Sequence, residues 1–179
     1  FRLDGEALHD YSGRSVSNAG DVNGDGFDDV IIGADGAPNG NYFGSSYVVF
    51  GKASGFDAVM DLSGLDGSNG FRLDGEIAGD LSGWSVSSAG DVNGDGFDDV
   101  IIGAPDIGLS GNSFGSSYVV FGRASGFDAV MDLSGLDGSN GFRLDGETGS
   151  DESGRSVSSA GDVNGDGFDD VIIGAPDAN

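Results

Sequence analysis

The nine-residue segment Asp-Val-Asn-Gly-Asp-Gly-Phe-Asp-Asp occurs three times without change, at residues 21–29, 91–99 and 162–170. Oxygen-bearing side chains stand at alternate positions of this segment, and the glycines between them allow a tight turn. This is the pattern with which a chain surrounds a hard divalent cation by oxygen ligands. Three copies at regular spacing predict a repeat protein that binds such an ion in every repeat.

The repeat extends well beyond the acidic segment. Aligning the copies makes Phe1, Phe71 and Phe142 equivalent starting points, which are 70 and 71 residues apart. A period of this length is typical of a propeller, a solenoid or an array. We therefore expect one propeller segment that consists of two repeats and a partial third, with boundaries at 1–70, 71–141 and 142–179.

Each repeat contains four short segments with the character of β-strands, bounded by clusters of Gly, Asn, Asp and Ser. The first set lies at residues 15–22, 29–33, 46–51 and 71–75. No window carries a 3.6-residue periodicity over the length of a helix. The pattern predicts an all-β fold of β-propeller-type blades, each with four antiparallel strands. A β-sandwich is the alternative, but sandwiches do not repeat so long a unit so closely.

The predicted blades do not close a ring within this chain. Residues 1–5 match a fourth strand without its own blade, and the last repeat supplies only two strands, ending near Gly174. Propellers usually close with about four to eight blades. The chain also begins at Phe1 without Met or a signal peptide. We therefore expect either a piece of a longer chain, or subunits that complete one another's blades through exposed strand edges.

The charge of the chain excludes some classes of partner. It has 31 acidic and 7 basic residues, for a formal net charge of −24. Such a field repels nucleic acid and anionic membrane surfaces, and no apolar run approaches the roughly 20 residues of a membrane span. We expect neither nucleic-acid binding nor membrane insertion. Cysteine is absent, so bound metal is the expected substitute for disulfides.

The acidic segment favours calcium over other metals. Counted from Asp21 as position 1, side-chain oxygens stand at positions 1, 3, 5 and 9, and the Phe27 carbonyl at position 7 can face inward. Four oxygen side chains and one carbonyl, without Cys or His, suit calcium and not zinc. Magnesium demands a tighter octahedron with more water and is a weaker competitor.

Two other interpretations of this segment are less favoured. An EF-hand loop would carry a bidentate carboxylate at position 12, where this chain has Ile32, Ile102 and Ile173 and continues as a strand rather than a helix. A simple hairpin turn explains the glycines. It does not explain why carboxylates converge in all three copies, where each cluster would repel itself without a cation.

The repeats resemble the FG-GAP repeat of integrin alpha-subunit propellers and of large bacterial secreted or surface proteins. The motif runs Ser-Gly-Arg-Ser-Val-Ser (12–17), then the acidic loop, then Val-Ile-Ile-Gly-Ala (30–34). The second and third copies end in Gly-Ala-Pro, whereas Asp35 interrupts it in the first copy. The resemblance covers nearly the whole chain, and the Phe-Gly that names the family is Ser-Gly here.

The resemblance implies a blade for each repeat and one Ca²⁺ in each loop that joins the first and second strands. The family's ligands carry over to five positions in each copy, with the phenylalanines acting through their carbonyls. These predicted ligands are Asp21, Asn23, Asp25, Phe27 and Asp29; Asp91, Asn93, Asp95, Phe97 and Asp99; and Asp162, Asn164, Asp166, Phe168 and Asp170.

Together these observations predict a calcium-binding structural or adhesive module of an extracellular, secreted or cell-surface protein. Its partner would be a protein or glycan ligand or further copies of itself. The alternatives are a self-assembling filament or array subunit and an accessory domain of a secreted enzyme. We expect no enzymatic activity in this chain, since nearly every acidic pair belongs to a repeated motif whereas a catalytic site normally appears once. The loops at 34–45 and 104–115 differ between copies, so they are the expected place for a ligand.

Three further features carry expectations. His9 is the single histidine, and its counterparts are Gly79 and Ser150, so it is expected in a solvated loop. Trp84 takes the place of an arginine in the other copies and is expected to pack between blades, with contact to a ligand as the less favoured alternative. An arginine precedes an aspartate by two residues at the same place in every copy, which predicts a structural ion pair or a capped strand edge: Arg2 with Asp4, Arg72 with Asp74, and Arg143 with Asp145.

Overall fold

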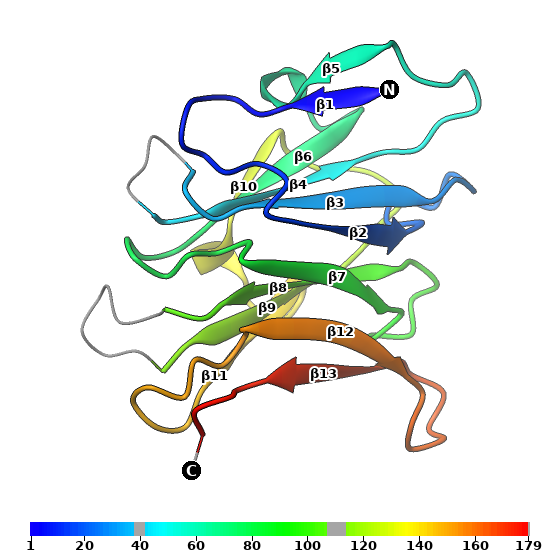
Figure 1. The fold of residues 1–179 in the computed structure, drawn as a ribbon. Helices are drawn as coiled ribbons and strands as arrows, with labels where there is room; N and C mark the ends of the chain where they lie inside the picture. Colours follow the sequence, from blue (N-terminus) through cyan, green and yellow to red (C-terminus); the bar gives the residue numbers. More distant parts are fainter. Residues whose placement is uncertain (38–41, 107–113, 179) are drawn as a thin grey trace.

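The computed structural model describes residues 1–37, 42–106 and 114–178 and confirms the all-β fold. The sheets follow one another from the N terminus at the top of Figure 1 to the C terminus at the bottom. They do not close into a ring. Within the described part of the chain, no helix is long and apolar enough to cross a membrane.

The two complete blades are four-stranded and antiparallel, as predicted. The first contains β2 (Ser15–Gly20), β3 (Asp29–Ala34), β4 (Ser45–Val49) and β6 (Gly70–Asp74). The second contains β7 (Ser85–Gly90), β8 (Asp99–Ala104), β9 (Ser116–Val120) and β11 (Gly141–Asp145). The described part of the last repeat contains the hairpin of β12 (Ser156–Gly161) and β13 (Asp170–Gly174).

Two short parallel strands were not predicted. In the first repeat, β5 (Val59–Asp61) pairs in parallel with β1 (Arg2–Asp4), and in the second, β10 (Val130–Asp132) pairs in parallel with β6. Each is followed by a 3₁₀ turn, at Leu62–Gly64 and Leu133–Gly135. Because β10 follows β9 in the chain but joins the outer strand of the first blade, this connection ties adjacent blades together.

The blades pack face to face through the alternating side chains of their strands. Ile31 points into the core between the first and second blades, whereas its neighbour Ile32 lies in the core on the other face of the same sheet. Phe127 extends the first of these cores and stacks on Phe71, with ring centroids 4.6 Å apart. A buried strand with apolar residues on both faces is what two-sided packing requires.

A glycine near the end of each second strand allows the next blade to approach closely. A Cβ at Gly33 would lie 1.9 Å from the carbonyl oxygen of Gly83, which belongs to the turn that precedes β7. A Cβ at Gly103 would likewise lie 2.0 Å from the carbonyl oxygen of Gly154. The Ser15 hydroxyl donates a hydrogen bond to that Gly83 carbonyl at 3.0 Å. The repeated Ile-Ile-Gly-Ala segment therefore fits the spacing of the blades.

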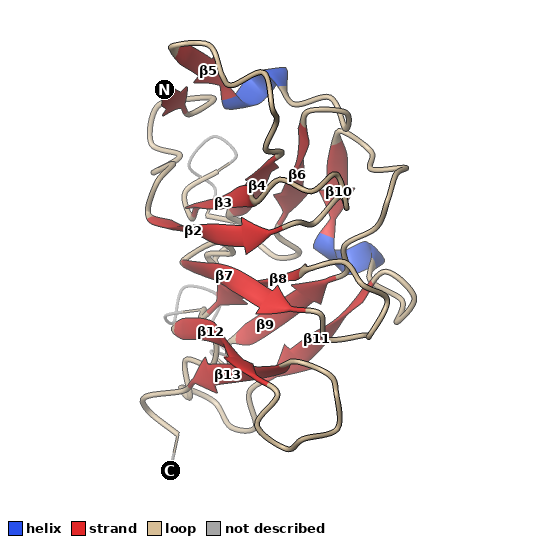
Figure 2. Cartoon of the chain, turned by 90° about the vertical axis from the view of Figure 1, so that its right-hand side faces the viewer, coloured by secondary structure: helices blue, strands red, loops and turns tan. Residues whose placement is uncertain are grey.

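The first strands of the three repeats, β2, β7 and β12, pack side by side along one edge of the molecule (Figure 2). The acidic segments follow these strands directly. All three acidic loops consequently lie on the same side of the molecule, at the right in Figure 1.

Candidate metal centre

The first acidic loop is held in shape by its own polar side chains. The Asp21 carboxylate accepts hydrogen bonds from the N–H groups of Asp25 and Gly26 at 3.0 and 2.9 Å. The Asn23 side-chain oxygen accepts the Asp25 N–H at 2.8 Å, and the Asp25 carboxylate accepts the Phe27 N–H at 3.0 Å. Positive φ angles at Gly24 and Gly26, 73° and 88°, let the backbone turn this tightly.

The other two loops repeat this arrangement. The Asp91 carboxylate accepts the Asp95 and Gly96 N–H groups at 3.1 and 2.9 Å. The Asp162 carboxylate accepts the corresponding N–H groups of the third loop at 3.1 and 3.0 Å. The structure thus brings the predicted ligands at positions 1, 3 and 5 together around one turn in every repeat.

The aspartate at position 9 connects the loop to the sheet. Asp29 and Asp99 are buried, and each carboxylate accepts two backbone N–H groups, one from its own loop and one from the second residue after the third strand. Burial is the main reason that the pKa of Asp29 is raised to about 6 and that of Asp99 to about 7. The nearby carboxylates at positions 1 and 5 contribute to the rise, and the two backbone N–H groups oppose it. Asp170 is only half-buried and accepts the Val163 N–H at 2.9 Å.

The donor chemistry of these loops fits a hard cation. Among the ion pairs within the described residues, none includes a carboxylate of an acidic loop. Across residues 1–37, 42–106 and 114–178, however, no group of three or more His, Cys, Asp or Glu side chains is arranged to hold a metal ion. The loop carboxylates accept backbone N–H groups instead, and the fifteen residues remain predicted ligands.

Sequence reasoning missed the aspartate at position 8, which reaches the preceding blade. The Asp98 carboxylate accepts the Asp21 N–H at 2.8 Å, and the Asp98 N–H donates to the Asp21 carbonyl at 3.3 Å. Asp169 makes the same two contacts with Asp91, at 3.0 and 3.1 Å. The only signal in the sequence is that position 8 is aspartate in all three copies.

The phenylalanine at position 7 has a second role that the sequence did not indicate. The ring of Phe97 lies against Gly24 of the preceding loop, where an added Cβ would be 2.3 Å from the ring. Phe168 lies against Gly94 in the same way, at 2.4 Å. Adjacent acidic loops therefore touch through both a polar contact and a packed ring.

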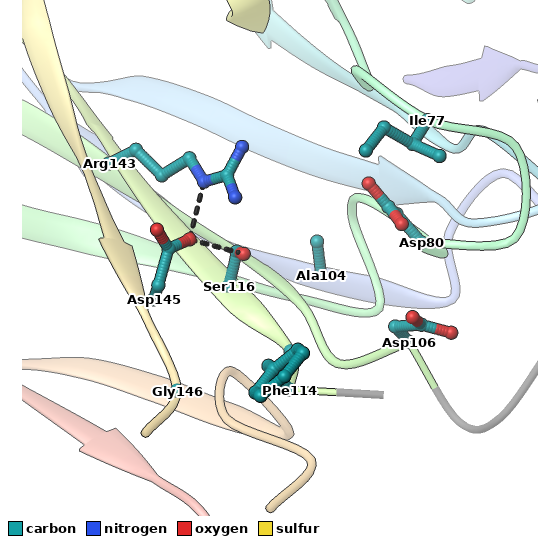
Figure 3. A pocket seen from close by; sticks show the side chains of 10 residues that line it. Ile77, Asp80, Ala104, Asp106, Phe114, Ser116, Arg143, Asp145 and Gly146 are labelled. Atoms are coloured by element: carbon teal, nitrogen blue, oxygen red, sulfur yellow. Dashed lines mark hydrogen bonds and ion pairs between the residues drawn. The ribbon is translucent and has the colours of Figure 1, made fainter. Parts of the chain in front are cut away.

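An open cleft of about 520 Å³ lies at the opposite end of the strands (Figure 3). Arg143 lines one side of it and pairs with Asp145 at 2.5 Å and with Glu76 at 2.6 Å. Asp80 lies on the far side, and its burial raises its pKa to about 6, with Asp106 and Glu76 adding to the rise. Of the loops expected to meet a ligand, residues 38–41 and 107–113 lie outside the described residues.

The expectations for His9, Trp84 and the Arg–Asp pairs are confirmed. His9 is exposed. Trp84 stacks between blades, with the Arg14 guanidinium 3.8 Å and the Arg155 guanidinium 5.3 Å from its ring centroid. The three predicted Arg–Asp pairs all form, at distances from 2.5 to 2.8 Å.

Stacked four-stranded blades, each with an acidic turn between its first and second strands, define a class of propeller repeat. The chain matches the FG-GAP repeat family over residues 12–49, 82–120 and 153–179, and it belongs to that family. This confirms the resemblance drawn from the sequence.

The chain is also similar to integrin alpha chains. It is 34% identical to integrin alpha-PS5 of Drosophila melanogaster over 176 residues, covering 97% of this chain and 16% of the relative. It is 32% identical to integrin alpha-4 of Xenopus laevis over 178 residues, covering 98% of this chain and 15% of the relative. The chain therefore spans about one-sixth of the length of the curated relatives it matches.

Proposed function

We propose that the chain is a calcium-stabilised set of propeller blades that serves as a non-catalytic adhesion or ligand-binding module of an extracellular or cell-surface protein. The observation that carries the proposal is the acidic loop of an FG-GAP repeat, present in three copies with the same oxygen donors and the same turn. Similarity to integrin alpha chains over nearly the whole chain supports the adhesive role.

Each loop supplies the groups that a calcium ion would need. Positions 1, 3, 5 and 9 offer side-chain oxygens, and position 7 offers its carbonyl. A bound calcium ion supplies positive charge to a cluster that has none. The buried Asp29 and Asp99 carry the largest cost of desolvation in the first two loops, so their carboxylates gain most from a nearby cation.

Calcium bound in this way would stabilise the fold rather than take part in a reaction. The position-9 carboxylate also holds the segment just after the third strand, through the Gly51 N–H in the first blade and the Gly122 N–H in the second. A loop held by calcium would therefore fix three strands of its blade. Binding to the folded state alone adds about 2.7 kcal/mol at a hundredfold excess over the dissociation constant.

Thermal unfolding tests this proposal directly. We expect millimolar calcium to raise the melting temperature above that measured in chelator. Replacing Asp25, Asp95 and Asp166 together by alanine should abolish the calcium-dependent part of the shift, whereas His9→Ala should leave it intact. Calorimetric titration should give three bound ions per chain. A melting temperature that is the same with calcium and with chelator would refute the structural role of the metal.

Contact between copies is a second candidate, and one observation favours it. Apolar side chains at the two ends of the stack are exposed: Val16 of β2 by 67%, Ile172 of β13 by 61%, and Val163 of the third acidic loop by 73%. Such ends fit either further blades of one polypeptide or a second copy. Light scattering with calcium and with chelator separates the two, since only association between copies gives a mass above 17.9 kDa.

A further inference from the structure

Adjacent acidic loops are joined by one contact that recurs at both junctions between blades. At each junction the position-8 aspartate of one blade and the position-1 aspartate of the blade before it exchange two hydrogen bonds. We call this pair of bonds the loop clamp. One of its two bonds is made to a carboxylate, which makes it stronger than a hydrogen bond between neutral groups. Two independent occurrences with matching geometry mark the clamp as a property of the repeat.

The clamp joins residues that are, or directly flank, predicted ligands. In the preceding loop it fixes the backbone of Asp21, whose own carboxylate holds the turn. In the following loop, Asp98 stands between Phe97 and Asp99, which are predicted ligands at positions 7 and 9. The clamp therefore connects the backbone of one loop to the next loop through Asp98.

Packing acts in the same direction as the clamp. The Phe97 ring rests on Gly24 so closely that no side chain could stand there. The carbonyl predicted to bind calcium belongs to this same phenylalanine. Reorienting position 7 in one loop would therefore disturb the turn of the loop before it.

We propose that the acidic loops bind calcium with positive cooperativity, and that Asp98 and Asp169 are the positioning residues that couple each loop to the loop before it. This inference rests on the proposed calcium function. A first ion orders its own loop and, through the clamp, part of the adjacent loop. That adjacent loop then loses less conformational entropy when it binds the second ion, so the second ion binds more tightly. By linkage the effect is reciprocal between neighbours.

Residue-resolved titration tests the coupling in the 179-residue chain. The N–H resonances of Gly26, Gly96 and Gly167 report on the three loops separately during a calcium titration. Asp95→Ala should abolish binding in the second loop. We expect calcium affinity to fall about tenfold in the first and third loops as well, although their residues are unchanged.

A matched pair of variants tests the clamp itself. Asp98→Ala removes the acceptor of the Asp21 N–H, whereas Asp28→Ala removes the same residue of the first loop, which faces no preceding loop in this chain. Only Asp98→Ala should weaken calcium binding at Gly26 about tenfold, and Asp98→Asn, which keeps an acceptor oxygen, should restore most of it. In calcium-free buffer, only Asp98→Ala should speed hydrogen exchange of the Asp21 amide.

The outcomes distinguish a failure of the proposed coupling from a failure of the proposed calcium binding. If Asp95→Ala leaves the other loops at full affinity, the coupling is wrong and calcium binding stands. If Asp28→Ala weakens the first loop as much as Asp98→Ala does, the effect comes from charge alone and the positioning role is wrong. If no loop of the native chain responds to calcium, both proposals fail.

Discussion

Replacing Gly103 by alanine tests whether the blades stack as closely as the fold requires. An added Cβ would lie 2.0 Å from the carbonyl oxygen of Gly154 and 2.3 Å from the Ser85 hydroxyl. Gly103 is not in the left-handed region of backbone space, so the whole effect comes from contact and none from its φ angle. The Gly154 turn would have to retreat by roughly 1 Å or more to reach an ordinary separation.

The expected loss of stability follows from two effects. Overpacking of a close contact costs about 1–3 kcal/mol. The retreat also stretches the hydrogen bond from the Ser85 hydroxyl to the Gly154 carbonyl, now 2.8 Å long, which contributes about 0.5–1.5 kcal/mol. We therefore expect Gly103→Ala to lower the free energy of unfolding by about 2–4 kcal/mol.

Urea unfolding of the wild type and two variants measures this effect, with the free energy extrapolated to zero denaturant. The matched control is Gly174→Ala in the last repeat. There the nearest atom is the Ser156 hydroxyl at 2.3 Å, and no backbone of a following blade is present. Because a serine side chain can rotate away, this variant should lose less than about 1 kcal/mol. Equal losses at Gly103 and Gly174 would refute the argument that blade contact sets the cost.

Three further changes have defined outcomes. The pKa of Asp80, raised to about 6, lies above that of an unfolded aspartate, so the folded state binds this proton at higher pH than the unfolded state does. The free energy of unfolding therefore falls as pH rises from about 4 to 6, as it also does through Asp29 and Asp99. Asp80→Asn should reduce this slope in urea unfolding at a series of pH values. Phe127→Ala should cost about 3–5 kcal/mol in the same assay, and the equivalent Phe56→Ala, whose ring is only half-buried, clearly less. Trp84→Ala should cost about 1–2 kcal/mol through its two cation–π contacts, whereas a stability equal to that of wild type would show that these contacts contribute nothing.

Much of the fold could be predicted because its signals are local. The strands lie close to the predicted ranges, since β-branched runs bounded by Gly, Asn and Asp specify strands and turns over a few residues. The positions of the acidic loops, the four-stranded blades and the Arg–Asp pairs followed in the same way. The short strands β5 and β10 could not be predicted, because each is three residues long and forms only where another blade offers an edge.

The candidate site, too, could be predicted from the sequence only in part. Spacing within the loop was enough to bring positions 1, 3 and 5 to one turn. The roles of Asp98 and Phe97 could not be predicted from the sequence, because both residues contact a loop that lies about 70 residues earlier in the chain. No pattern within one loop distinguishes a side chain that serves its own turn from one that serves a neighbour.

Identical segments show what the tertiary structure alone decided. The sequence by itself determined three equal loops and three equal second strands, because the same residues have the same local preferences. The structure made them unequal: Ile102 is fully buried between blades, whereas its counterpart Ile173 is half-buried, and Ile172 is 61% exposed while Ile101 is buried. Burial depends on which sheet covers a face, and that is a property of the stacked blades rather than of any one repeat.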